Sequence, residues 1–245
     1  MRPVCRGSSP QTDDFSNYSD AKPELVSRLG PYCSYCERPI HTNFAVEHIQ
    51  PKGLAEYAHL VGCWSNFLLA CVNCNSSKSD KNVDLAQTIL PDRDNSFFAL
   101  RYLPDGRIEP SAEAISGGFK TMVAATLALT GLDKVPVKTL DSHGRQVALD
   151  RVSQRMQIWL KAEDAKTDIE NNPANSVLRE FAAKLAVAEG FFSIWMTVFD
   201  GDPDMRNRLI DAFPGVRGSG CFDPISTAPV SPAPNPDGLA HGGKL

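Results

Sequence analysis

The sequence lacks any run of about 18 or more apolar residues, the length that a membrane-spanning helix needs. Its opening stretch, MRPVCRGSSPQTDDF, also lacks the apolar segment of a secretory signal. We therefore expect no membrane association and a cytoplasmic protein.

Positive net charge is missing as well. The chain has 25 Lys and Arg against 29 Asp and Glu, a formal net charge of -4 at pH 7. This balance gives no general attraction to nucleic acid or to an anionic membrane, so any nucleic-acid contact must be local or shared with a partner. With 42% hydrophobic residues among 245, the chain can form a substantial core in one large domain or two modest ones.

Disulfide bonds are not expected, because seven cysteines is an odd number in a chain without an export signal. Two C-x-x-C pairs are present, Cys33 and Cys36 in YCSYCERPI and Cys71 and Cys74 in ACVNCN. Together they predict one structural Zn²⁺ per chain, held by four thiolates that leave no open position for water. A thioredoxin-like redox pair would explain one C-x-x-C but not two. The other cysteines, Cys5, Cys63 and Cys221, are expected to be unliganded.

The pattern along the chain predicts an α+β fold with four regions. Between and after the cysteine pairs lie two short apolar segments, FAVEHI and WSNFLLAC, and a polar helix. The later segment FFALRYLPDGRIEP predicts a hairpin around Pro-Asp-Gly. We expect a mobile lead over 1–30 with one short helix at Lys22–Leu29, a zinc-stapled unit over 31–110, a helical domain over 111–215, and a disordered Pro- and Gly-rich tail over 216–245.

In the helical domain, apolar residues recur at helical spacing. Helices are predicted over Ala112–Leu129 and about Gly144–Asp168, and a third is predicted to start with Asn172 as N-cap and Pro173 in its first turn. The apolar stripe that follows is expected to belong to the core, and it comprises Val177, Phe181, Leu185, Phe192, Trp195 and Phe199.

Candidate site residues lie between and just after the cysteine pairs. Glu47 and His48 are adjacent, and adjacent strand residues face opposite ways, so they can serve one site only if the strand ends or twists near Pro51 and Gly53. Hydrolysis of a phosphodiester needs a base for water and a cation to neutralise charge. Glu47, His48 and Asn75 can supply both.

Lysines accompany these residues. Asn75, Lys78 and Lys81 are three apart, so a helix would place them on one face. Lys78 and Lys81 are candidates for contacts with nucleic-acid phosphates. Lys52 is a further candidate, although a solvated lysine after a proline is the more common explanation.

The pattern C-x-x-C, EHI-x-P-K, an intervening Asn and C-x-x-C-N-x-x-K resembles the HNH nuclease family over about residues 32–81. The resemblance implies a ββα-metal core in which His48 is the general base and Asn66 shapes the loop. It also implies that Glu47 and Asn75 hold one catalytic divalent ion. Histidine is frequent in the family at the position of Asn75, and an all-oxygen pair suits Mg²⁺ or Mn²⁺ better than Zn²⁺.

The function implied is a metal-dependent endonuclease acting on DNA. Two alternatives remain, an RNA-cleaving nuclease of the same fold and a non-catalytic zinc-stapled adaptor in which Glu47 and His48 are incidental. Loss of function on changing His48 to alanine would separate a nuclease from an adaptor.

A longer pattern is similar to the HNH subunits of Septu and retron-associated antiphage systems, which work beside an ABC-type ATPase. It comprises WSNFLLAC-x-x-CN, LPDRDN, the PDG hairpin, the helical half and GCFD. This implies a partnered defence nuclease. Between Cys33 and Lys81, four Lys and Arg balance four Asp and Glu, whereas tight DNA binding uses about 6 to 10 phosphate contacts. We therefore expect the partner to supply part of the affinity for DNA.

Overall fold

The computed structural model describes residues 1–134, 142–143 and 150–245. Its strands are β1 Ala45–His48, β2 Phe67–Ala70, β3 Leu100–Tyr102 and β4 Ile108–Pro110. The α-helices are α1 Lys22–Leu29, α2 Val72–Lys78, α3 Ser96–Ala99, α4 Ala112–Ser116, α5 Lys120–Thr130, α6 Arg151–Asn171, α7 Ser176–Glu189, α8 Phe192–Val198, α9 Pro203–Ala212 and α10 Val216–Ser219. Short 3-10 helices cover Tyr18–Ala21 (η1), Ala55–Leu60 (η2) and Trp64–Asn66 (η3).

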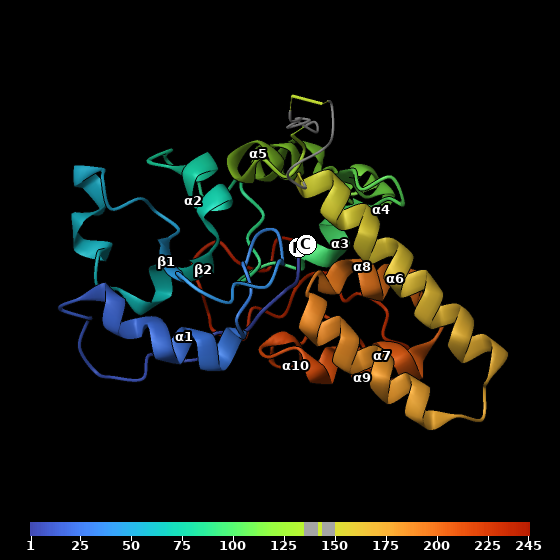
Figure 1. The fold of residues 1–245 in the computed structure, drawn as a ribbon. Coiled ribbons are helices and arrows are strands. Elements are labelled where there is room, and N and C mark those ends of the chain that lie inside the picture. The colour runs from blue at the N-terminus through green and yellow to red at the C-terminus, as the bar shows by residue number, and fades with distance from the viewer. Residues whose placement is uncertain (135–141, 144–149) are drawn as a thin grey trace.

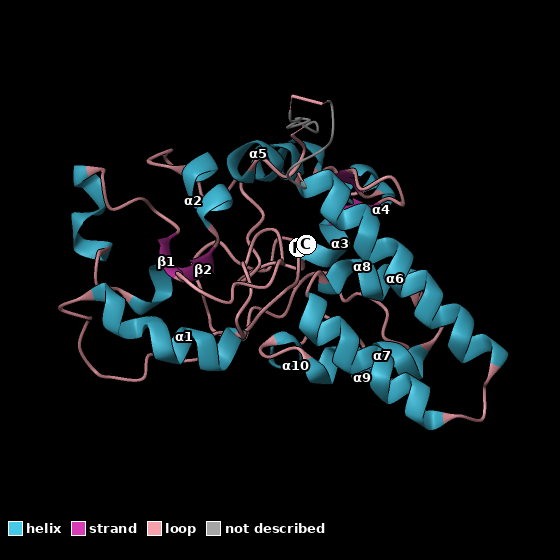
Figure 2. Cartoon of the chain, in the orientation of Figure 1, coloured by secondary structure: helices cyan, strands magenta, loops and turns pink. Residues whose placement is uncertain are grey.

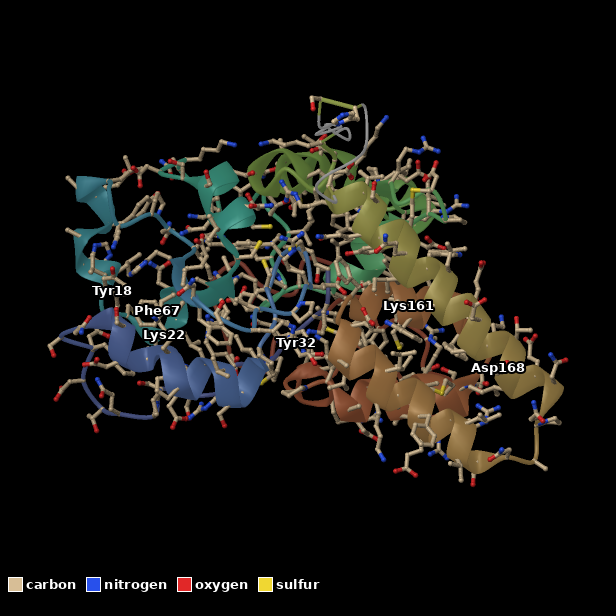
Figure 3. The ribbon with its side chains drawn as sticks, in the orientation of Figure 1. Tyr18, Lys22, Tyr32, Phe67, Lys161 and Asp168 are labelled. Carbon is tan, nitrogen blue, oxygen red and sulfur yellow. The ribbon has the colours of Figure 1, made fainter. Side chains whose placement is uncertain are left out.

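Helices and strands are mixed in the described chain, which confirms the expected α+β class (Figure 2). In Figure 1, α1, β1, β2 and α2 form one end of the molecule, and α6, α7 and α9 form the other. Figure 3 places Tyr18, Lys22 and Phe67 at the first end and Asp168 of α6 at the second. No helix in the described ranges is long and apolar enough to cross a membrane.

The predicted ββα unit is present. β1 and β2 pair antiparallel, with Glu47 opposite Leu68 and His48 opposite Phe67. Every residue of β2 is buried, as its uninterrupted apolar sequence requires. Cys71 then serves as the N-cap of α2, so the second cysteine pair lies where strand passes into helix. The predicted hairpin also forms, from β3 and β4.

The first two predicted helices of the helical half differ from those in the structure. The single helix expected over Ala112–Leu129 is divided into α4 and α5, because Gly117 ends α4 and Gly118 adopts a φ of 83°. Residues 144–149 of the second predicted helix lie outside the described residues. The described remainder, α6, runs on to Asn171.

The start of the third helix is also corrected. α7 begins at Ser176, and its N-cap is Asn175, whose side chain accepts a hydrogen bond from the amide of Val177. Asn172 instead ends α6, and its side chain donates to the carbonyl of Asp168 at 2.9 Å. The tight connection between α6 and α7 therefore includes the Asn-Pro segment expected to open the helix.

The expected core stripe divides between two helices. Gly190 and Phe191 have φ values of 73° and 55° and separate α7 from α8. The later part is buried, namely Phe192 and Trp195 of α8 and its C-cap Phe199. The α7 part is exposed, with Val177 at 53%, Phe181 at 63% and Leu185 at 38%. The core assignment was therefore wrong for α7, which buries its small residues Ala182, Ala183 and Ala186 instead.

The N-terminal lead is ordered rather than mobile. Arg6 is 1% exposed, and its guanidinium donates to the carbonyl of Phe67 and pairs with Asp92 at 2.8 Å. Arg2 donates to the carbonyl of Pro214 at 2.6 Å and to that of Leu29 at 2.5 Å. Two buried arginines thus fix this polar segment through contacts remote in sequence.

The expected disordered tail is also wrong. Asn95 is fully buried, and its side chain donates to the carbonyls of Cys221 at 2.8 Å and Val230 at 2.9 Å. Asp94 pairs with Lys244 at 2.9 Å. The tail has few apolar residues to bury, but buried polar side chains from the segment before α3 satisfy its backbone.

Candidate active site

The four predicted cysteines come together in a buried cluster. Their sulfur atoms all lie within 4.8 Å of one another, and Cys36 Sγ and Cys71 Sγ are 3.6 Å apart. A tetrahedral Zn²⁺ with bonds of about 2.3 Å requires sulfur atoms about 3.8 Å apart. The cluster therefore has the composition and size of a structural zinc site, as the two C-x-x-C pairs predicted.

The hydrogen bonding among these four thiols indicates that a cation is needed within the cluster. Hydrogen bonds from Cys33, Cys36 and Cys74 lower the pKa of Cys71, whereas hydrogen bonding with Cys33 raises the pKa of Cys36 and of Cys74. Such crowded thiols can all ionise only when a positive charge lies among them. Arg151 at the start of α6 adds one donor, since its Nη1 lies 3.4 Å from Cys74 Sγ. The helical half is thereby linked to the cluster.

A turn in the tail has the same backbone hydrogen-bond pattern as the turn that contains the first cysteine pair. In the first turn, the Cys33 amide donates to the Arg38 carbonyl at 3.0 Å, beside a bridge between Tyr32 and Pro39. In the second, the Asp223 amide donates to the Ala228 carbonyl at 2.9 Å. The equivalent bridge joins Phe222 and Pro229.

Asp223 and Ser226 take the places of the two cysteines in this second turn. Asp223 Oδ1 accepts hydrogen bonds from the Ser226 amide at 2.7 Å, the Ser226 hydroxyl at 2.8 Å and the Ile225 amide at 3.1 Å. One carboxylate thus satisfies the donors of the turn. Hydrogen bonds to Asp223 therefore stand where metal ligation is predicted in the first turn, and one zinc per chain remains the prediction.

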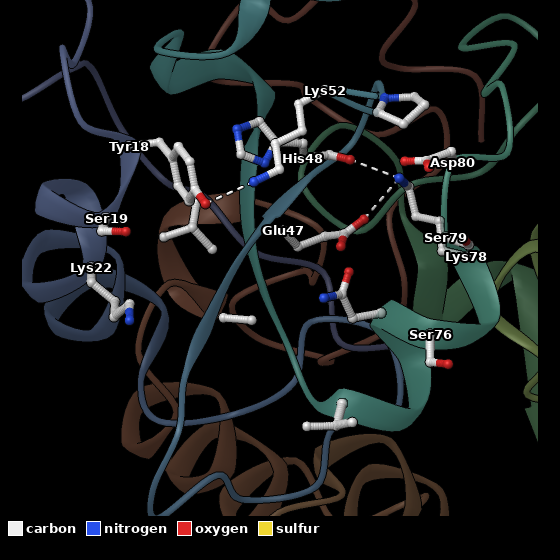
Figure 4. Close-up of a pocket in the computed structure, with 15 residues that line it drawn as sticks. Tyr18, Ser19, Lys22, Glu47, His48, Lys52, Ser76, Lys78, Ser79 and Asp80 are labelled. Atoms are coloured by element: carbon white, nitrogen blue, oxygen red, sulfur yellow. Dashed lines mark hydrogen bonds and ion pairs between the residues drawn. The ribbon is translucent and has the colours of Figure 1, made fainter. Parts of the chain in front are cut away.

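A separate pocket of about 570 Å³ contains the candidate catalytic residues (Figure 4). Glu47, His48 and Asn75 all line it. β1 ends at His48, so the strand stops where the sequence required it to stop if adjacent residues were to serve one site. Glu47 is 2% and His48 6% exposed, so both are almost withdrawn from solvent.

His48 is held in one orientation. Its Nε2 lies 3.0 Å from the carbonyl oxygen of Val61, which can only accept, so Nε2 carries the proton and Nδ1 keeps its lone pair. Burial lowers the pKa of His48 below its ordinary value, with the Val61 contact opposing the shift. The imidazole is therefore neutral at neutral pH, which is the form a general base needs.

Asn66 fixes the loop that supplies this carbonyl. Its side-chain oxygen accepts from the Gln50 amide at 2.8 Å, and its nitrogen donates to the carbonyls of Gln50 at 3.0 Å and Leu60 at 3.4 Å. Because Leu60 precedes Val61, Asn66 connects the end of β1 to the residue that orients His48.

Glu47 has an internal counter-ion. Lys78 Nζ lies 3.0 Å from Glu47 Oε1 and donates to the His48 carbonyl at 2.7 Å (Figure 4). Tyr35 donates its hydroxyl to the same Glu47 oxygen at 3.3 Å. Burial raises the pKa of Glu47, and Lys78 opposes that shift. Lys78 is only 1% exposed. It is therefore a partner of Glu47, not the exposed phosphate contact that the sequence suggested.

The helix face predicted for Asn75, Lys78 and Lys81 does not form. α2 ends at Lys78, where Ser79 adopts a φ of 47°. Asn75 is exposed and faces the pocket, whereas Lys81 lies beyond the helix and donates to the Ala128 carbonyl at 3.3 Å. Spacing alone could not reveal that the helix stops after two turns.

The Lys78–Glu47 ion pair gives a stability prediction. The variant Lys78→Met leaves a buried carboxylate without its cation, and we expect the free energy of unfolding to fall by about 3 to 5 kcal/mol. Denaturant titration without divalent ions measures this loss, with Lys81→Met as the exposed control on the same segment. Equal stability of the two variants would contradict a tightly held pair. Recovery of Lys78→Met on adding Mg²⁺ would show that Glu47 accepts the ion.

The residues fit a hard divalent cation. A buried carboxylate from Glu47 and an amide oxygen from Asn75 line one pocket, and oxygen ligands are those that Mg²⁺ and Mn²⁺ prefer. Within the described ranges, the Asn75 side chain makes no hydrogen bond that would compete with a metal.

Sequence reasoning missed part of the pocket. Tyr18 and Ser19 of η1 and Lys22 of α1 form one of its walls, and Lys52 adjoins them (Figure 4). Tyr18, Ser19 and Lys22 precede the first cysteine pair and form no motif with it, so no local pattern indicated their position, whereas Lys52 was a candidate from the sequence.

Comparison with known protein families agrees with this arrangement. Residues 33–81 match the family model for HNH endonucleases. The matched segment contains both cysteine pairs and all of β1, β2 and α2. No curated protein matched the chain. The family match supports a nuclease.

Proposed function

We propose that this chain is a metal-dependent endonuclease that hydrolyses phosphodiester bonds of DNA, since residues 33–81 match the HNH endonuclease family model. The observation that carries the proposal is the orientation of His48, whose Nε2 proton is directed at Val61 while Nδ1 has no hydrogen bond to any described residue. Glu47 and Asn75 line the same pocket and supply oxygen ligands beside this base.

Each residue has a definite task in the proposed reaction. His48 Nδ1 accepts a proton from water as the water oxygen bonds to phosphorus and the bond to the leaving oxygen breaks. Glu47 and Asn75 would hold Mg²⁺ or Mn²⁺, and the bound ion would neutralise charge on the phosphate and the leaving oxygen. Asn66 keeps Val61 in place, so that His48 presents the correct nitrogen. The cysteine cluster holds β2 and α2 but takes no part in the chemistry.

Digestion of matched DNA and RNA, each single- and double-stranded, tests the substrate class. We expect cleavage of DNA with Mg²⁺ or Mn²⁺ and none with EDTA, because the pocket offers a base but needs a cation. Cleavage of RNA alone would favour the RNA-cleaving alternative. Absence of any cleavage, even with an added partner, would favour the zinc-stapled adaptor.

We also propose that the nuclease acts with an ABC-type ATPase in an antiphage defence complex of the Septu or retron-associated kind. The similarity of the longer sequence pattern suggests this partner. Lys78 is occupied by Glu47, which leaves few cations near the pocket to bind DNA. The exposed apolar residues of α7 offer the ATPase a surface. In the digestion above, robust DNA cleavage by the chain alone at physiological salt would contradict the need for a partner.

A further inference from the structure

One wall of the active-site pocket comes from outside the segment that matches the HNH family. Tyr18, Ser19 and Lys22 form this wall, and Ser76 and Ser79 lie across from it (Figure 4). The two sides come from η1 with α1 and from the region of α2. The pocket is thus closed by a segment that precedes the first cysteine pair.

The wall is firmly attached to the rest of the protein. Arg2 donates to the carbonyl of Leu29 at the end of α1. Arg28, also on α1, donates through Nη1 to the carbonyls of Arg6 at 3.0 Å and Ser8 at 2.5 Å. The buried Arg6 in turn donates a hydrogen bond to the Phe67 carbonyl of β2, so Arg6 connects α1 to this buried strand. The wall therefore has a fixed position beside His48.

Lys22 has no charged partner in the described chain. It is half-buried, and its side chain extends from α1 toward the pocket (Figure 4). Among the described residues it makes no ion pair or side-chain hydrogen bond. An uncompensated ammonium in a concave site attracts an anion.

Lys52 is a second uncompensated cation, and Tyr18 determines its position. Its Nζ lies 2.7 Å from the Tyr18 hydroxyl and 4.3 Å from the centroid of that ring. The edge-on contact of Tyr18 with His48 has a centroid separation of 4.8 Å. A neutral hydroxyl leaves the charge of Lys52 intact, so the lysine is presented next to the base.

The charge of the pocket favours an anionic ligand. Its acidic residues are Glu47, which is paired with Lys78, and Asp80 at the end of the α2 region. Among the described residues, therefore, two lysines without an ion pair line the pocket with one carboxylate that has none. The hydroxyls of Ser19, Ser76 and Ser79 add neutral donors, which bind phosphate oxygens without sequence preference.

We propose that Lys22, Lys52 and Tyr18 form a binding subsite for the nucleic-acid backbone, in which the two lysines contact phosphates next to the scissile one. Tyr18 is a positioning residue that holds Lys52 beside His48. This proposal rests on the proposed nuclease function. It assigns substrate contacts to Lys22 of the N-terminal segment and to Lys52, instead of to Lys78 and Lys81.

Binding measurements without divalent ions test the subsite apart from cleavage. Fluorescence anisotropy with a short DNA duplex at several salt concentrations compares Lys22→Gln and Lys52→Gln with Lys120→Gln, an exposed lysine of α5 outside the pocket. Each pocket variant should weaken binding several-fold and reduce the salt slope by about 0.9, the contribution of one phosphate contact. The Lys120 variant should match the unchanged protein.

Tyr18→Phe provides a separate test of positioning. It keeps the ring against His48 but removes the hydroxyl that Lys52 contacts, so it should weaken binding without changing the melting temperature. In cleavage assays, the lysine variants should raise KM with little change in kcat, as expected for lost substrate binding.

The outcomes separate the subsite from the catalytic proposal. If the lysine variants bind DNA with the affinity and salt slope of Lys120→Gln, the subsite is wrong even when the protein cleaves DNA. If they lose binding but the unchanged protein with its partner cleaves no nucleic acid, the subsite is supported and the nuclease function is wrong.

Discussion

Replacing Cys71 by Ser should leave the protein insoluble or without a cooperative unfolding transition, not merely slower in a reaction. Cys71 directly follows β2 and is the N-cap of α2, and its sulfur lies in the buried four-cysteine cluster. Structural zinc sites contribute on the order of 10 kcal/mol of folding free energy. That exceeds the net stability of many small domains, so loss of one ligand should abolish folding of the ββα unit.

Metal content and thermal unfolding measure this effect together. The matched control is Cys63→Ser, because Cys63 is only partly buried and its sulfur contacts the Ser65 hydroxyl at 3.1 Å instead of the cluster. We expect the control to retain one zinc per chain and its melting temperature. A well-folded, unaltered protein containing no zinc would contradict the assignment.

Sequence alone predicted the parts of the fold that depend on neighbouring residues. The cysteine spacing and apolar segments indicated β1, β2 and α2, and Pro-Asp-Gly indicated the hairpin of β3 and β4. Periodicity also showed that α7 has an apolar face. It could not show that this face is exposed, because burial depends on the position of the whole helix and not on its own sequence.

The features that the sequence did not predict depend on contacts between segments that are far apart in the chain. Composition suggested disorder for the tail, yet Asn95 binds two of its carbonyl groups. Spacing suggested a solvent-facing Lys78, yet the short α2 directs it to Glu47. Tyr18 reaches His48 across the fold with no motif to mark it. The candidate base was thus predictable from a local pattern, whereas the surroundings that tune it were not.

The His48→Ala variant should lose DNA cleavage while keeping its zinc. A positioned general base contributes about 10²- to 10⁴-fold in rate, and a loss of at least a hundredfold is expected. The ring of His48 contacts Tyr18 and also Phe67, at a centroid separation of 5.2 Å, so its removal leaves a small gap in the pocket. We expect a nearly unchanged melting temperature, because the cysteine cluster and the buried β2 hold the domain independently of this ring.

His48→Asn is the companion variant, since it refills part of the volume but offers no basic nitrogen. His59→Ala, at an exposed position on η2, is the control for losing a histidine without touching the pocket. Cleavage assays with the partner present, zinc analysis and thermal unfolding should show both His48 variants folded, zinc-loaded and inactive, and the His59 variant active. Cleavage retained by both His48 variants would remove His48 from the mechanism. Because the pocket would still present Glu47 and Asn75, another of the residues that line it would then have to be the base.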